Sequence, residues 1–256
     1  MLLRRVIEHV REQNWTAISI DFVIVVIGVF VGLQVQEWSQ GRADRQSERQ
    51  IVQDLLADLE LDRSNYASAV TADEGAIVAA ATSLAEAGLP PIAIDRLISR
   101  TNLANYTLDV SRLAAVPAVR RDLLWTDVVS GYFPIPNTVT YDAMVGAGDL
   151  KIINNRDIVR ELQTYHALTG TVNSQNVKLL ALRANTLSVG ATYGLAPFAT
   201  MPEQDYFNLV ANSPQLAATI RIQATFAIFH RGEAASADAR AARLQQHLKD
   251  YLKAEE

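Results

Sequence analysis

The 256-residue chain contains no cysteine. Disulfide frameworks, thiolate nucleophiles and metal sites with cysteine ligands are therefore excluded. The formal net charge is −5 and the basic residues form no stripe, which argues against nucleic acid as a partner. The 12 glycines and 8 prolines are too few for a sandwich of many short strands.

The chain also lacks the common catalytic and metal-binding motifs. It has no GxSxG sequence, no Walker loop and no GxGxxG after a strand. Its four histidines stand in no HExxH or H-x-H spacing: His9, His166, His230 and His247. We interpret His166 and His230 as hydrogen-bonded histidines of the core or its boundary rather than as ligands. We expect no metal, no cofactor and no enzymatic activity.

Two regions outside the N-terminus are rich in polar side chains. Tyr141 and Asp142 form one, and residues 154–157 form the other. We expect both to cap helices, with ligand binding as the alternative. The carboxylates of Asp58, Glu60 and Asp62 are expected to spread around a helix rather than to converge.

One apolar run lies near the N-terminus, between Trp15 and Trp38. Every residue from Phe22 to Leu33 is apolar or glycine. At about 1.5 Å of rise per residue the two tryptophans lie roughly 35 Å apart, close to the thickness of a hydrocarbon core with its interfaces. Tryptophan prefers that interface. We therefore predict a transmembrane helix over residues 16–38, anchored at its ends by Trp15 and Trp38.

Two alternatives to a transmembrane helix are a buried core helix and a cleaved signal peptide. The bulky and polar residues 33–37 do not resemble a small-x-small cleavage site. Orientation is harder to read, because three arginines flank each end: Arg4, Arg5 and Arg11, and Arg42, Arg45 and Arg49. Long domains translocate largely regardless of charge. We expect a cytoplasmic tail at 1–15 and a periplasmic domain at 39–256, in the bacterial inner membrane.

One stripe of this helix carries small and polar residues at spacings of four, seven, four and four: Ala17, Asp21, Gly28, Gly32 and Gln36. Gly28 and Gly32 allow two backbones to approach closely. A carboxylate near mid-membrane costs roughly 2.5–3.5 kcal/mol and usually faces protein or water. We predict that this stripe contacts another transmembrane helix, from a second copy or a different protein, while membrane lipid covers the rest. Alternatively, the glycine spacing is accidental and Asp21 is protonated or reaches the interface.

The rest of the chain has helical periodicity. Apolar stripes predict long helices over residues 43–86, from Asn154 or Asn155 onward, and from Ser213-Pro214 onward. Shorter helices are expected over 92–103, 119–129 and 138–145, and residues 105–111 are expected to be a loop or a lone extended segment. The predicted fold class is all-α, with one N-terminal transmembrane helix followed by an antiparallel bundle of three or four long helices.

Two stretches show a resemblance to a known family. Residues 21–38 pair an acidic residue with a glycine-containing apolar run, Leu33-Gln34 and Trp38, and residues 140–157 place a short helix and a small-residue turn before a polar stretch that opens a long helix. Both resemble the signature of a family of uncharacterised bacterial single-pass membrane proteins. Asp21 stands where that family has glutamate. The resemblance implies membrane anchorage and a match over essentially the full length, and it assigns no activity because the family has no known function.

These observations favour a non-enzymatic role. We expect a membrane-anchored scaffold or accessory subunit of a membrane protein complex. The alternative is an extracytoplasmic sensor or small-ligand-binding module. Only about 15 residues precede the membrane segment, too few for a cytoplasmic output domain.

Overall fold

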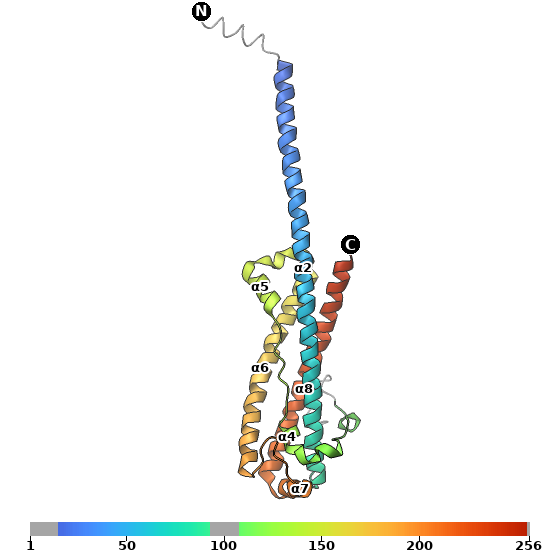
Figure 1. The fold of residues 1–256 in the computed structure, drawn as a ribbon, viewed down its shortest axis with the longest axis vertical. Helices are drawn as coiled ribbons and strands as arrows, with labels where there is room; N and C mark the ends of the chain where they lie inside the picture. The colour runs from blue at the N-terminus through green and yellow to red at the C-terminus, as the bar shows by residue number, and fades with distance from the viewer. Residues whose placement is uncertain (1–14, 93–107, 255–256) are drawn as a thin grey trace, which may run out of the picture. The chain divides into compact units, whose positions relative to one another are not determined.

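The computed structural model describes residues 15–92 and 108–254, and all regular structure within these ranges is helical (Figure 1). The predicted all-α class is confirmed. The chain divides into two compact units, Met1–Ile51 and Val52–Glu256. Helix α2 (Trp15–Glu86) begins in the first unit and ends in the second.

Three long helices form the second unit: the part of α2 after Val52, α6 (Arg156–Thr192) and α8 (Pro214–Ala254). Helix α8 runs antiparallel to α2, because Gln245 bonds Glu60 whereas His230 bonds Asp73. It also runs antiparallel to α6. Helices α2 and α6 therefore run in the same direction, and the described residues 108–155 between them return along the bundle (Figure 1).

The returning segment places short helices at opposite ends of the bundle. Helix α4 (Leu124–Val128) lies with α7 (Glu203–Asn212) at one end, and α5 (Val139–Ala147) lies at the other (Figure 1). The predicted helix over 119–129 is instead a 3-10 helix, Ala118–Leu123, followed by α4. Helix α7 was not predicted from the sequence. Most of the predicted helix over 92–103 lies outside the described residues, and Val110–Arg112 is a 3-10 turn.

Helix boundaries follow the expected capping residues. Helix α5 ends at Gly148, whose φ of 74° is readily adopted by glycine. The side chain of Asn155 accepts hydrogen bonds from the backbone N–H groups of Asp157 and Ile158, which caps α6. Helix α8 begins at Pro214, where the fixed φ of proline suits the first turn.

The core lies along the predicted apolar stripes. Alanines supply much of the buried face of α8 and let the neighbouring helices pack closely: Ala224, Ala227, Ala234, Ala237 and Ala241. Near α4 the core is aromatic, and Trp125 packs directly on Gly190 of α6. A β-carbon at Gly190 would overlap the Trp125 indole. This close approach, rather than helix propensity, requires glycine at that position.

Candidate functional site

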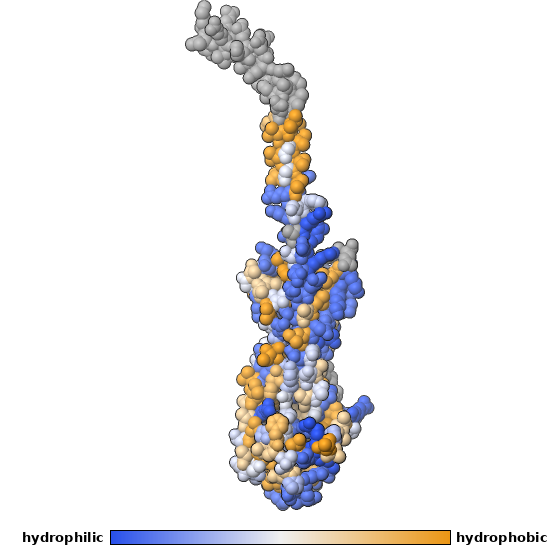
Figure 2. Space-filling model, viewed as in Figure 1, coloured by the Kyte–Doolittle hydropathy of each residue, from blue (hydrophilic) through white to orange (hydrophobic). Residues whose placement is uncertain are grey.

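The apolar segment of α2 has no intrachain cover in the described part of the first unit. Eleven large apolar side chains between Phe22 and Val35 are 48–69% exposed. The helix is long and apolar enough to cross a membrane by length and composition. Figure 2 shows this surface as a nearly uninterrupted apolar band. A core helix would be mostly buried, so this exposure argues against the buried-helix alternative.

The predicted helix-contact stripe is partly described. Gly28, Gly32 and Gln36 are exposed, and nothing lies within 4 Å of a β-carbon built on either glycine. Ala17 and Asp21 lie in the backbone of α2, but their side chains fall outside what the structure describes. The contact with another helix therefore stays a prediction.

The two predicted interface anchors are also partly described. Trp15 is the first residue of α2, and its side chain is likewise not described. Trp38 is exposed, and the guanidinium of Arg42 lies 3.8 Å from the centroid of its ring. This cation–π pair, four residues apart on one helix face, was not anticipated from the sequence. It joins an amphipathic ring to a permanent charge where the apolar segment ends.

In the second unit, two carboxylates of α2 converge on the start of α5. Asp62 accepts a hydrogen bond from the backbone N–H of Asn137 at 2.6 Å. Asp58 accepts one from the Asn137 side chain at 2.7 Å and one from the backbone N–H of Thr140 at 3.1 Å. The expectation that Asp58, Glu60 and Asp62 spread apart was therefore wrong for Asp58 and Asp62. Their spacing of four residues puts both on one helix face, whereas Glu60 bonds Gln245.

Asp62 also accepts a hydrogen bond from the hydroxyl of Tyr165 at 2.6 Å, next to the hydroxyl of Tyr66. Burial raises the pKa of Asp62, and the bonds from Tyr165 and Asn137 oppose that rise. Burial also raises the pKa of Tyr66 to about 12 and that of Tyr165 further. The group thus ties α2, α6 and the segment before α5 together through hydrogen bonds.

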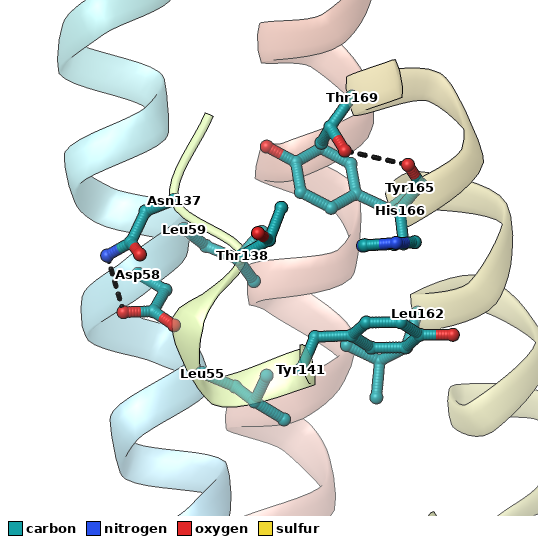
Figure 3. Close-up of a pocket in the computed structure, with 10 residues that line it drawn as sticks. All are labelled: Leu55, Asp58, Leu59, Asn137, Thr138, Tyr141, Leu162, Tyr165, His166 and Thr169. Atoms are coloured by element: carbon teal, nitrogen blue, oxygen red, sulfur yellow. Dashed lines mark hydrogen bonds between the residues drawn. The ribbon is translucent and has the colours of Figure 1, made fainter. Parts of the chain in front are cut away.

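A small pocket lies beside this group, between α2, α5 and α6 (Figure 3). The rings of Tyr141 and His166 stack in it at 4.2 Å, and His166 Nε2 lies 3.8 Å from a carboxylate oxygen of Asp142. His166 Nδ1 is buried without a partner among the described atoms. The cavity volume of about 20 Å³ suits one ordered water, which needs about 10–15 Å³. The pocket is therefore the size of a water site, not a substrate site.

His230 lies in a fully buried polar cluster between α2, α6 and α8. Its Nδ1 lies 2.7 Å from Asp73 and its Nε2 lies 3.0 Å from Asn176 Oδ1. Asn176 donates its amide to the carbonyl of Pro134 at 2.7 Å, which fixes the amide orientation. Nε2 must therefore carry a proton, and one further proton is shared between Nδ1 and Asp73.

Both ring nitrogens of His230 are occupied, so neither faces a cavity where it could act as a base. Burial raises the pKa of Asp73, and the bond and charge of His230 oppose that rise. The expectation of a hydrogen-bonded core histidine is confirmed for His230. Periodicity gave no sign of the cluster, because its members come from three helices.

Comparison of the chain with protein-family models, with curated proteins and with solved structures finds no match.

Proposed function

We propose that this chain is a single-pass protein of the bacterial inner membrane and serves as a non-enzymatic scaffold or accessory subunit of a membrane protein complex. The observation that carries the proposal is the uncovered apolar surface of α2 between Phe22 and Val35. The resemblance of residues 21–38 and 140–157 to a family of single-pass membrane proteins supports the same location.

The energetics favour lipid over water for this surface. Fully burying a large aliphatic or aromatic side chain gains about 1.5–3 kcal/mol. Eleven such side chains, each about half exposed, gain on the order of 10 kcal/mol on entering lipid. This exceeds the roughly 2.5–3.5 kcal/mol cost of a carboxylate such as Asp21 near mid-membrane.

Fractionation of lysed cells tests the anchor. After high-speed centrifugation without detergent, the uncleaved chain is expected in the membrane pellet and in the soluble fraction only after detergent is added. Uncleaved chain in the supernatant would overturn the proposal. Fusions of a periplasm-specific and a cytoplasm-specific reporter to the C-terminus then test the orientation, with activity expected only from the periplasmic reporter.

The stripe of Ala17, Asp21, Gly28, Gly32 and Gln36 is the proposed docking face for a partner helix. Replacing Gly28 and Gly32 by isoleucine is expected to weaken association in a membrane two-hybrid assay, because the β-branched side chains keep the backbones apart. Isoleucine at Val23 and Val26, on other sides of the helix, is the matched control and is expected to change little. Equal association of both variants would exclude this face as the interface.

The hydrogen bonds of the buried polar side chains support the role as a scaffold. Asp62, Asp73 and His230 are all held in hydrogen bonds that join separate helices. Such groups stabilise one packing arrangement rather than position a reaction.

Purification in mild detergent followed by mass spectrometry distinguishes the candidate roles. Stoichiometric membrane subunits that co-purify with the chain would support the scaffold. A lone homo-oligomer carrying a metabolite would favour a sensor or ligand-binding module instead.

A further inference from the structure

A groove with arginines on both walls lies between α6 and α8. Its cavity volume is about 200 Å³, ten times that of the pocket beside His166. Residues in the first turns of α6 and the last turns of α8 line it: Arg160, Glu161, Thr164, Tyr165, Arg240, Arg243 and Leu244. The periodic stripes used to predict the core do not include its arginines.

The charges of this groove are unevenly compensated. Arg240 and Arg243 are exposed and have no ion-pair or hydrogen-bond partner within residues 15–92 and 108–254. Arg160 pairs with Asp157 at 3.4 Å, but both side chains are more than three-quarters exposed, so water screens that pair. The one carboxylate that lines the groove, Glu161, lies 2.8 Å from His247, which is not among the lining residues.

The floor of the groove is less polar than its walls. Tyr165 and Leu244 line it and are 8% and 3% exposed. The hydroxyl of Tyr165 is already bonded to Asp62, so this ring presents apolar surface to the groove. A charge held over an apolar floor is less screened than one on open surface.

We infer that this groove binds a phosphate group. The planar guanidinium of arginine matches phosphate oxygens in a bidentate way, and three arginines around one cavity suit an anion with more than one charge. The group belongs either to a free phosphate compound or to the headgroup of an anionic phospholipid, since both present the same oxygens. This assignment goes beyond the scaffold role and does not depend on the membrane anchor.

Titration of the full chain in a neutral detergent with inorganic pyrophosphate tests the free-phosphate source. Calorimetry is expected to show one site per chain, at least about tenfold weaker in the variant R240Q/R243Q, because two bidentate donors are lost. The matched control is K249Q/K253Q, which removes two exposed positive charges from the same helix outside the groove. The control is expected to bind within about twofold of the original chain.

Native mass spectrometry tests the headgroup source. The chain is extracted from nanodiscs made of phosphatidylcholine and phosphatidylglycerol, and the retained phosphatidylglycerol is counted for the original chain and both variants. Retention lost only in R240Q/R243Q, without pyrophosphate binding, would assign the groove to a lipid headgroup.

Two results would overturn the inference: neither probe binds, or both double variants lose binding equally, which would mean that only net charge matters. Far-UV circular dichroism and a thermal melt confirm that the variants fold. If R240Q/R243Q does not fold, Arg160→Gln on the opposite wall gives an independent reading, and unchanged binding there would equally contradict the site.

Discussion

The Asp73–His230 pair allows a sharp test of how the buried cluster stabilises the fold. Both side chains are almost inaccessible, at 2% and 4% exposed. His230→Ala removes the partner of Asp73 and of Asn176 Oδ1 at once and leaves a buried carboxyl group without compensation. Such a loss costs about 3–5 kcal/mol of unfolding free energy.

Asp73→Asn is expected to behave very differently, although it changes the same contact. The asparagine amide donates to the lone pair of His230 Nδ1, and Nε2–H still donates to Asn176. The contact between residues 73 and 230 keeps a hydrogen bond and the pair stays neutral. We therefore expect a change within about 1 kcal/mol.

The pH dependence gives a second reading of the same pair. The pKa of Asp73 in the folded protein lies above its ordinary value of 3.8, mainly because of burial. Above pH 3.8 the unfolded chain releases this proton while the folded protein retains it. The stability from this residue is fully present below that pH and is lost as the pH rises through the folded pKa. The asparagine of the Asp73→Asn variant cannot titrate, so the unfolding free energy of the variant rises relative to that of the original chain as the pH rises.

Urea unfolding of the full chain in detergent, followed by circular dichroism across a pH series, measures both effects. If Asp73→Asn lost as much unfolding free energy as His230→Ala, the assignment of a proton to Nε2 of His230 and of a shared proton between Nδ1 and Asp73 would be refuted. An unchanged pH slope in Asp73→Asn would show that the residue does not hold the extra proton.

Three further predictions concern the second unit. Gly190→Ala is expected to destabilise the protein by about 1–3 kcal/mol in urea unfolding, because the new methyl group displaces Trp125; adding Trp125→Leu should recover part of the loss, and no loss would disprove the close approach. Asp58→Ala is expected to cost about 1–2 kcal/mol and to speed hydrogen exchange at Thr140, whose N–H it caps from outside the helix; unchanged exchange would contradict the contact. Burial raises the pKa of Tyr66 and Tyr206 to about 12, so phenolate absorbance should show these tyrosines ionising at higher pH than the exposed ones. The unfolding free energy that these two neutral tyrosines contribute is lost as the pH rises through that value. Titration of all the tyrosines as one class near the ordinary value of 10.0 would refute this prediction.

The sequence by itself determined the long helices and several of the helix ends. An apolar run between two tryptophans, stripes repeating every three or four residues, and caps such as Asn155, Gly148 and Pro214 are local signals. Each depends on residues within one or two turns of each other. The structure confirms the long helices and these caps because nothing distant has to be known to place them.

Only the tertiary structure decided which side chains meet. Asp58 reaches Asn137 across 79 positions, Tyr165 reaches Asp62 across 103, and His230 reaches Asp73 across 157. No local period encodes such pairs, because they depend on how the described residues 108–155 run back along the bundle. The same path makes α2 and α6 run in one direction. Contacts between helices therefore formed the buried polar clusters and the arginine groove, whereas spacing along the chain formed the helices themselves.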